Sequence, residues 1–287
     1  MTIDGVQIAE TVLTRLRDLL KEFDRMPGLA ALVAGDDPRL KKFVQLKKKT
    51  AERIGIQFSS YEFRGNVGQD EIFEVIRWLN EDDTIDGILV ELPLPKQLDP
   101  QGILDAITSA KDVDVLSGER QRAYYGDTPE LLPPAVGALK ALIQAHNIQI
   151  KGKRAAVFGQ SMLIGKPVAH WLERQGAAVN RIDEHTKHPE RFSREADIVV
   201  SGVGKPGLIT GNMIKEGAVV IDYGYERKPF DSAQAEHSPK ANVLGDVDFE
   251  SVSPKAKLIT PVPGGMGPIV IAALMENLLL IASRSRL

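Results

Sequence analysis

Hydrophobic and polar residues alternate along the chain with two different periods. Apolar residues recur at helical spacing in some segments and fill short continuous runs in others, which indicates helices and buried strands. In the first part of the chain, helices are predicted at residues 5–23, 39–54 and 69–82, and strands at residues 28–35, 57–63 and 86–95. Because strands and helices alternate, the pattern predicts a mostly parallel sheet with helices on its faces.

A second series of elements begins after a proline-rich stretch and a helix within residues 125–153. It contains predicted strands at residues 154–159, 177–183, 196–202 and 217–223 and a helix at residues 164–175, and a last helix, 268–285, is expected to return to the first domain. This rhythm is typical of a doubly wound sheet. We therefore predict an α/β protein with a cleft between two domains. One is a three-layer α/β domain of residues 1–124 and 268–287, and the other is a Rossmann-like, doubly wound parallel-sheet domain of residues 125–267.

The composition narrows the classes of function. The chain has 287 residues, of which 43% are hydrophobic and 26% charged, and a net charge of -3, so it lacks the basic excess of a nucleic-acid-binding protein. It contains no cysteine, which excludes disulfides, thiolate metal sites and cysteine nucleophiles. The apolar stretch 268–283 is interrupted by Glu276 and Asn277, so we expect a packed helix and not a membrane span. A cytoplasmic location is the simplest expectation.

Residues 41–49, KKFVQLKKK, contain five lysines. On a helix, one face would carry Leu40, Phe43, Val44, Lys47, Ala51 and Ile54, so Lys47 interrupts an apolar stripe while the other lysines point mostly elsewhere. A lysine on a packing face needs a partner or a reason for its desolvation. The alternatives are a side chain whose stem lies on apolar surface with its ammonium in water, or a basic surface for a polyanion.

Two acidic positions follow apolar segments. Glu91 comes directly after a strand, in VELPLP, and would pair with Lys47 if the end of that strand lies beside the helix. In KDVDV, residues 111–115, strand-like alternation puts Asp112 and Asp114 on one side. The alternative for Glu91 is a carboxylate facing water, and for the two aspartates it is a polar strand edge.

A glycine-containing turn joins the strand at 154–159 to the next helix. In GQSMLIGKP, Gly159 and Gly165 bring backbone amides to a helix N-terminus, where an anionic group is favoured. The spacing matches neither the standard dinucleotide fingerprint nor the P-loop, so a tight structural turn is the alternative. Asp183 ends the next strand, where an acid accepts hydrogen bonds from an adenosine ribose, and Glu184 follows it. Two acids there would repel a 2'-phosphate, which favours NAD over NADP.

The stretch TPVPGGMGP, residues 260–268, combines rigid prolines with glycines directly before a helix. It allows the backbone to approach a flat ligand, and a domain hinge would explain it almost as well. His185 and His188 lie in a charged loop without a matching set of ligands, so we interpret them as surface residues and predict no metal site.

Over essentially its whole length, the chain resembles the bifunctional methylenetetrahydrofolate dehydrogenase/cyclohydrolase family. The matching stretches are AGDDP, FVQLKKKTAERIGI, DGILVELPLPKQLD, KDVD, GQSMLIGKPVA, ADIVVSGVGKPGLITGNMIKEGAVVID, GDVDF and ITPVPGGMGPIVIAAL. The resemblance implies oxidation of 5,10-methylenetetrahydrofolate with a nicotinamide cofactor and hydrolysis of the methenyl product to 10-formyltetrahydrofolate. It also implies a cytoplasmic homodimer in one-carbon metabolism that supplies purine biosynthesis.

The resemblance also implies roles for individual residues. Lys47 matches the catalytic lysine of the hydrolytic step, Asp114 matches the acid that receives the N–H donors of the pterin, and Glu91 stands beside them at the catalytic site. Phe43, Pro263, Gly264 and Gly265 would contact the folate. The cofactor would be held by Gly159, Gln160, Ser161, Ile164, Gly165, Asp183, Glu184 and Tyr225.

The chain departs from the family pattern at several positions. Phe43 stands where most members have a tyrosine four residues before the lysine, and Glu91 stands where they have a glutamine. A carboxylate beside Lys47 would hold it protonated, which hinders its use as a general base. Residues 132–135 read LPPA in place of PCTP, and Val270 replaces a threonine. Where the second cofactor strand often ends in histidine and serine, this chain has Asp183 and Glu184, in agreement with a preference for NAD.

Our main hypothesis is an enzyme with both activities. The alternatives are a member that has lost one step, a folate- or nucleotide-binding protein without turnover, and a nucleic-acid-binding protein that uses residues 41–49. The last of these requires Lys47 in solvent and predicts steeply salt-dependent binding.

Overall fold

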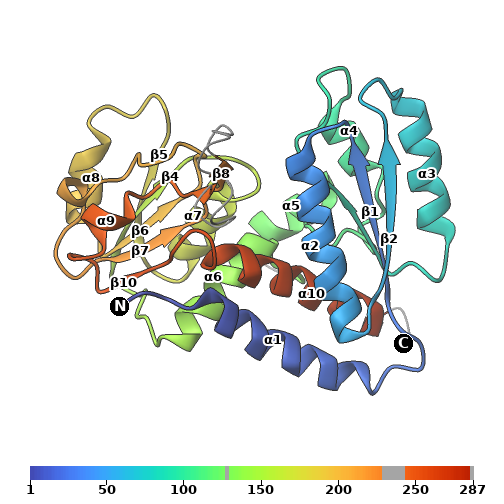
Figure 1. Cartoon of the computed structure of the whole chain (residues 1–287), viewed down its shortest axis with the longest axis horizontal. Coiled ribbons are helices and arrows are strands. Elements are labelled where there is room, and N and C mark those ends of the chain that lie inside the picture. Colours follow the sequence, from blue (N-terminus) through green and yellow to red (C-terminus); the bar gives the residue numbers. More distant parts are fainter. Residues whose placement is uncertain (127–128, 228–242, 285–287) are drawn as a thin grey trace, which may run out of the picture. The chain divides into compact units, whose positions relative to one another are not determined.

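The computed structural model describes residues 1–126, 129–227 and 243–284, so the end of the predicted helix 268–285 lies outside the described residues. The chain divides into two compact units (Figure 1). The three-stranded unit comprises Glu10–Pro134 and Ile271–Leu287, and the five-stranded unit comprises Met1–Ala9 and Ala135–Val270. The boundaries fall inside helices α1 (Gly5–Leu20) and α10 (Met266–Arg284).

The three-stranded unit is built around a parallel sheet of order β2-β1-β3. Its strands are β1 (Gly28–Ala34), β2 (Gln57–Phe63) and β3 (Gly87–Val90), and its further helices are α2 (Pro38–Ile54), α3 (Gln69–Glu81), α4 (Pro100–Asp105) and α5 (Gly118–Tyr125). The central strand β1 is buried throughout, as the continuous apolar run predicts. Because the crossover from β1 to β2 runs in the opposite direction to that from β2 to β3, right-handed connections put α2 and α3 on opposite faces of the sheet (Figure 1).

Helix α2 begins and ends at strong local signals. The Asp37 side chain accepts a hydrogen bond from the Arg39 amide at 2.8 Å, and Pro38 occupies the first helical turn. Gly55, with φ of 97°, ends the helix in the left-handed conformation that glycine adopts without penalty. The helix buries Leu40, Val44, Ala51 and Ile54 on the predicted apolar face.

The segment after α4 continues the sheet beyond β3. Ile88 forms a parallel bridge with Asp112, and the Ile88 amide donates to the Lys111 carbonyl at 2.8 Å. Because the segments around Ile88 and Asp112 run in the same direction, the residues that follow each segment lie at the same edge of the sheet. This edge, where parallel strands end, is called the carboxyl edge below.

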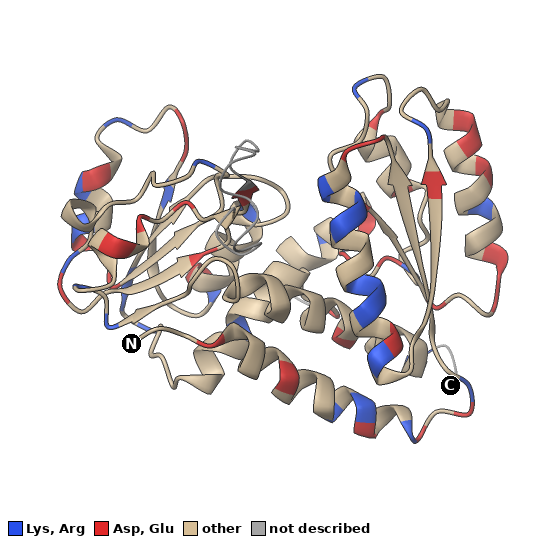
Figure 2. Ribbon diagram, in the orientation of Figure 1, with Lys and Arg blue, Asp and Glu red and all other residues tan. Residues whose placement is uncertain are grey.

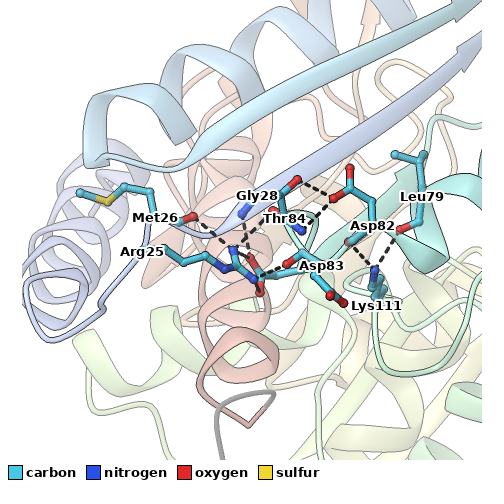
Figure 3. Close-up of polar contacts among 9 residues, drawn as sticks. Arg25, Met26, Gly28, Leu79, Asp82, Asp83, Thr84 and Lys111 are labelled. Carbon is cyan, nitrogen blue, oxygen red and sulfur yellow. Dashed lines mark hydrogen bonds and ion pairs between the residues drawn. The ribbon is translucent and has the colours of Figure 1, made fainter.

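A polar network closes the opposite edge of the three-stranded unit (Figure 3). The buried Asp86 carboxylate accepts two hydrogen bonds from the Arg25 guanidinium, at 2.7 and 2.8 Å, and one from the Gly28 amide at 2.8 Å. Lys111 donates to the carbonyls of Leu79 and Asp82 at the end of α3. The network therefore fixes the start of β1 and the end of α3.

The five-stranded unit contains a parallel sheet of order β10-β7-β6-β4-β5. Its elements are α6 (Pro134–Ala145), β4 (Arg154–Phe158), α7 (Gly165–Arg174), β5 (Ala178–Ile182), α8 (Pro189–Glu195), β6 (Ile198–Ser201), η1 (Gly211–Met213), β7 (Val219–Asp222), β8 (Glu226–Arg227), β9 (Val243–Leu244), α9 (Phe249–Val252) and β10 (Leu258–Ile259). Counted within this sheet, the strand order is 2-1-3-4-5, a common doubly wound order. Its topological switch point lies between β4 and β6, which is where ligands bind in such sheets.

The first residues of the chain belong to the five-stranded unit. The Ile3 amide donates to the Ile259 carbonyl at 2.8 Å, Thr2 bridges Ile259 in parallel, and the Gly5 amide donates to the Gly264 carbonyl at 3.0 Å. The sequence analysis placed residues 1–124 in the first domain, but the first nine residues belong to the five-stranded unit. It placed residues 125–134 in the second domain, but they belong to the three-stranded unit. Backbone pairing at the edge of a sheet leaves little trace in the pattern of apolar residues.

Within the described part of the chain, α10 is the one helix that is long and apolar enough to cross a membrane. Of its most apolar stretch, 61% is buried inside the protein. The buried Asn277 side chain donates to the carbonyls of Val113 and Leu132, both at 2.8 Å. Burial and a hydrogen-bonded polar side chain are typical of a core helix. They agree with the prediction of a packed helix.

The predicted elements are present, with ends shifted by a few residues. The strand expected at 86–95 is limited to Gly87–Val90, since Glu91 begins the proline-containing turn. The pattern missed the short helices α4, α5 and α8, each of which has only one or two turns and buries few residues.

Candidate active site

Lys47 lies on the packing face of α2, as the spacing of apolar residues predicts. Its side chain is 17% exposed, and its Nζ donates a hydrogen bond to Oε1 of Glu91, whose side chain is 7% exposed. The two charges are thus paired where little water reaches them. The condition stated for their pairing, that the strand end lies beside the helix, is met.

Glu91 and Asp114 reach Lys47 because of the sheet. The Glu91 amide donates to the Leu32 carbonyl at 2.9 Å, which continues the pairing of β3 with β1 up to the carboxyl edge. Asp114 lies two residues past the bridge between Asp112 and Ile88, so it emerges at the same edge. The charges of Glu91 and Asp114 both act on the Lys47 ammonium. These three side chains are called the Lys47 cluster below.

The charges in the Lys47 cluster alter one another's protonation. Burial alone lowers the pKa of Lys47, but the Glu91 and Asp114 carboxylates and the hydrogen bond to Glu91 outweigh it, so the pKa lies above its ordinary value. Burial raises the pKa of Asp114 to about 7; Lys47 opposes this shift, while the charges of Glu91 and Asp112 add to it. The lysine is therefore a firmly held cation, and Asp114 titrates near neutral pH.

Phe43 lies one turn before Lys47 on the same helix and is partly buried. Its ring carries no hydroxyl.

Asp112 has a different role from Asp114. Its carboxylate accepts hydrogen bonds from the amides of Leu116 and Ser117 at 2.9 and 2.8 Å. The alternation of KDVDV did not reveal this backbone contact.

Figure 2 shows several further Lys and Arg positions along α2, and three of these residues form exposed ion pairs. Lys41 pairs with Glu62 at 3.2 Å, Lys48 with Glu52 at 3.8 Å and Arg53 with Glu10 at 2.7 Å. A nucleic-acid surface formed by residues 41–49 required Lys47 in solvent, and this condition is not met.

The glycine-containing loop after β4 lies at the switch point of the five-stranded unit. Gly159 has φ of 87°, and a Cβ on it would stand 2.8 Å from the Gly202 carbonyl oxygen, in the loop that follows β6. A Cβ on Gly165 would collide with the Gly159 carbonyl, and one on Gly202 would meet the Ile164 side chain at 2.6 Å. These glycines allow the loops after β4 and β6 to pack closely.

Three further predicted cofactor residues shape the same loop. The side-chain Nε2 of Gln160 donates to the Gly159 carbonyl at 2.7 Å, the backbone amide of Ile164 donates to the Ser161 hydroxyl at 3.3 Å, and α7 begins directly afterwards at Gly165. Gly204, in the loop after β6, has φ of 77° and open space where a Cβ would project. The backbone around the switch point thus offers a ligand close approach and a helix N-terminus.

Two buried aspartates at the carboxyl edge, which the sequence reasoning did not single out, hold these loops. Asp246 accepts hydrogen bonds from the Ser201 hydroxyl and from the amides of Val203 and Lys205, at 2.7 to 2.8 Å. Asp222 accepts from the amides of Gly224, Asp246 and Val247. Burial raises the pKa of Asp222 to about 6, against the lowering effect of these amides. The strand ending at Asp222 and the stretch GDVDF were the available signals.

Asp183 and Glu184 follow β5, next to the glycine loop, whose Gly159 amide donates to the Ile182 carbonyl at 2.8 Å. The Asp183 carboxylate accepts from the Thr186 hydroxyl at 2.8 Å and from the His185 amide at 3.0 Å. The hydrogen bond from Thr186 is the main reason that the pKa of Asp183 lies below its usual value. Tyr225 lies beyond β7 and is partly buried.

The proline and glycine stretch before α10 is tied to the start of the chain. Gly264 has φ of 100°, and Cβ atoms on Gly5 and Gly265 would collide with the carbonyls of Gly265 and Pro261 respectively. Close backbone packing therefore explains the glycine at position 265. The predicted contact of Pro263, Gly264 and Gly265 with folate stays a prediction.

His185 and His188 have exposed side chains, at 85% and 66%, beside Glu184 and Glu190. Within residues 1–126, 129–227 and 243–284, no group of three or more histidine, cysteine, aspartate or glutamate side chains is arranged to hold a metal ion.

Comparison with known proteins identifies both parts of the chain. Residues 3–114 match the tetrahydrofolate dehydrogenase/cyclohydrolase catalytic domain, and residues 133–286 match the NAD(P)-binding domain of the same family. The bifunctional protein FolD of Halothermothrix orenii is 39% identical over 282 residues, which cover 96% of this chain and 95% of that protein.

Solved structures give the same picture. The methylenetetrahydrofolate dehydrogenase-cyclohydrolase (FolD) of Trypanosoma brucei, solved with NADP and an inhibitor, superposes with a TM-score of 0.94 at 32% identity, covering 100% of this chain and 98% of that chain. The NAD-dependent 5,10-methylenetetrahydrofolate dehydrogenase of Saccharomyces cerevisiae has a TM-score of 0.80 at 22% identity, with 99% and 98% covered, and shares the fold. The chain therefore belongs to the tetrahydrofolate dehydrogenase/cyclohydrolase family.

Proposed function

We propose that this protein oxidises 5,10-methylenetetrahydrofolate to the 5,10-methenyl form with a nicotinamide cofactor and hydrolyses that product to 10-formyltetrahydrofolate. Family membership along both halves of the chain supports the two reactions. The observation that carries the proposal is the Lys47 cluster at the carboxyl edge of the three-stranded unit. Its lysine and carboxylates stand at the positions that the family resemblance assigns to catalysis and folate recognition.

Asp114 is the proposed anchor for the substrate. An ionised carboxylate can accept two parallel hydrogen bonds from the amino group and ring N–H of a pterin. Because its pKa is raised to about 7, both protonation states are accessible at neutral pH. Only the ionised state offers two acceptors, so recognition should require the loss of the Asp114 proton.

Lys47 is the proposed electrostatic catalyst of hydrolysis. Its raised pKa makes it a cation that donates a hydrogen bond and stabilises negative charge where water attacks, and leaves it poorly suited to accept a proton. Without a hydroxyl on Phe43, this chain has one proton-transfer group fewer beside Lys47 than most of its relatives. Oxidation asks mainly that two rings be positioned, so it depends less on these two residues.

The five-stranded unit offers residues that fit a nicotinamide dinucleotide. Gly204 leaves open space in the loop after β6, and the glycine loop 159–165 leads directly into α7, whose N-terminus favours a pyrophosphate. A bound nicotinamide supplies the hydride acceptor. Asp183, kept ionised by the Thr186 hydroxyl and standing beside Glu184, favours a free ribose 2'-hydroxyl over a 2'-phosphate. We therefore propose NAD as the preferred cofactor, although the Trypanosoma brucei relative was solved with NADP.

The cofactor proposal is tested by steady-state kinetics with 5,10-methylenetetrahydrofolate and either NAD or NADP. We expect a lower KM for NAD in the wild type, and Asp183→Asn should lower the KM for NADP about tenfold or more, because like charges in contact are strongly unfavourable. Asp24→Asn, an exposed aspartate between α1 and β1, is the matched control. Equal KM values for both cofactors in wild type and Asp183→Asn would contradict the assignment.

A second candidate is a member that has kept only the dehydrogenase activity. Phe43 and Glu91 favour it, because both changes affect the groups around Lys47 and neither affects the cofactor loop. We also propose, from the family resemblance, a cytoplasmic homodimer that contributes to purine biosynthesis. Light scattering of the purified protein tests the dimer directly.

A further inference from the structure

Asp114 precedes a strained residue. Val115 has φ of 61°, in the left-handed region that a β-branched side chain rarely enters. The other two non-glycine residues with positive φ in the described chain are Asn147 and His188, types that tolerate this conformation better than valine. Strain of this kind persists only where the surrounding structure enforces it, and it gathers at functional sites.

Three side chains enforce the turn around Val115. Gln121 of α5 donates its side-chain amide to the Val115 carbonyl, and Asn277 of α10 donates to the Val113 carbonyl at 2.8 Å. Asp112 accepts from the amides of Leu116 and Ser117 through a single oxygen, Oδ2. The residues immediately before and after Asp114 are therefore both fixed by side-chain amides, and the following turn is fixed by a buried carboxylate.

The Asp114 side chain gains a defined position from this arrangement. Burial disfavours its ionised form, and the neighbouring Glu91 and Asp112 charges disfavour it further. A backbone free to relax would let the carboxylate turn towards water. The strained turn keeps it instead with Lys47, where it can meet a substrate.

We propose that Gln121, Asn277 and Asp112 are positioning residues that hold Val115 in its left-handed conformation and thereby fix the Asp114 carboxylate for substrate recognition. The proposal rests on the proposed function for the part that concerns folate. Because a glycine at position 115 would hold the same conformation without strain, it should make the Gln121 contact dispensable.

The test is a double-mutant cycle of Gln121→Met and Val115→Gly, because methionine keeps the volume of glutamine and removes the donor. We expect Gln121→Met to raise the KM for 5,10-methylenetetrahydrofolate about tenfold, the factor that one to two kcal/mol produces, with kcat nearly unchanged. Val115→Gly alone should leave KM close to the wild-type value, and the double variant should return to it. Gln144→Met, at an exposed position of α6, is the control.

Equal increases of KM in Gln121→Met and in the double variant would overturn the proposal, because the contact would then act independently of the Val115 conformation. A second readout needs no turnover: the titration of the Asp114 carboxyl, followed by NMR, should shift in Gln121→Met and recover in the double variant. If the wild type does not convert the folate, the proposed function fails, while the titration still decides whether Gln121 holds Asp114. An unchanged titration in Gln121→Met would refute that role, and Gln121→Ala repeats the test if the methionine variant does not fold.

Discussion

At the residue scale, Glu91 governs the charge of Lys47. The ammonium and the carboxylate are hydrogen-bonded with little solvent access, so removal of the carboxylate charge removes the strongest influence that keeps the lysine protonated. We expect Glu91→Gln to lower the pKa of Lys47, so that methenyl hydrolysis declines at a lower pH than in the wild type and is about tenfold slower at slightly alkaline pH, because the proposed catalyst is the protonated lysine. The hydrolysis rate of the methenyl compound, followed against pH, measures this.

The matched control for Glu91→Gln is Glu62→Gln. Glu62 pairs with Lys41 on the same helix, but both side chains are about half exposed, at 51% and 46%. Exposed ion pairs contribute about 0 to 1 kcal/mol, so this change should leave both the hydrolysis rate and its pH profile unaltered. A pH profile that is the same in Glu91→Gln and wild type would show that the Lys47 charge does not limit hydrolysis.

The raised pKa of Asp114 makes the free energy of unfolding depend on pH. Its folded-state pKa of about 7 lies above the ordinary value of 3.8, so between these two values the folded protein holds a proton that the unfolded chain has lost. The free energy of unfolding therefore falls as pH rises through this window. Asp114→Asn cannot ionise, and its melting temperature relative to wild type should be higher at pH 8 than at pH 5. A difference that is the same at both pH values would contradict the raised pKa.

The sequence could predict Lys47 and Glu91 but not what surrounds Asp114. Helical periodicity places Lys47 among apolar neighbours, and the end of an apolar strand marks Glu91, so both depend on local patterns. The hydrogen bond from Asn277 to Val113 joins residues 164 positions apart, and the strain at Val115 depends on such distant contacts. No local pattern contains that information.

At the scale of elements, the two edges of the three-stranded sheet have different tasks. The carboxyl edge holds the Lys47 cluster, whereas the opposite edge is held together by Arg25 and the buried Asp86. Asp86→Asn would turn an amide group towards the Arg25 guanidinium and should lower the free energy of unfolding by about 2 kcal/mol. For a chain of 287 residues, at about 2.1 cal/mol/K of unfolding entropy per residue, that is a fall of roughly 3 °C in melting temperature.

Both activities should be unchanged in Asp86→Asn well below its melting temperature, because the altered edge lies at the far end of the strands from Glu91. Asp83→Asn is the control, since the hydrogen bond from Arg25 to Asp83 goes to the main-chain carbonyl, which the substitution keeps. If the melting temperature of Asp86→Asn equalled that of Asp83→Asn, the Arg25 pair would not be structural.

The pattern of apolar residues predicted the long elements better than the short ones. Strand β1 and helix α2 have enough residues for their periods to be recognised, and both were predicted within one residue of their observed ends. Helix α4 has six residues, and its capping signal, Asp99 followed by Pro100, precedes a segment too short to show a helical period. Helices α5 and α8 likewise begin with local capping or proline signals and lack a sustained apolar face.

At the scale of the whole molecule, the alternation of strands and helices predicts two α/β parts, and the family comparison agrees along both. The observed division differs from the predicted one where the first residues pair with β10, because an edge strand of a few residues carries little sequence signal. The proposed preference for NAD rests on two side chains after the end of β5, so the fold alone leaves the preference open.

The central claim, that one chain catalyses both reactions and that Lys47 serves the second, is tested most directly by following both products together. Wild type and Lys47→Ala are given 5,10-methylenetetrahydrofolate and NAD, while reduced nicotinamide and the methenyl compound are measured simultaneously, with Lys49→Ala as an exposed control on the same helix. We expect reduced nicotinamide from all three proteins, and accumulation of the methenyl compound only in Lys47→Ala, with hydrolysis slowed about 10²-fold or more. Methenyl accumulation in the wild type would contradict the second activity, and the absence of reduced nicotinamide with either NAD or NADP, despite folate binding, would contradict the first.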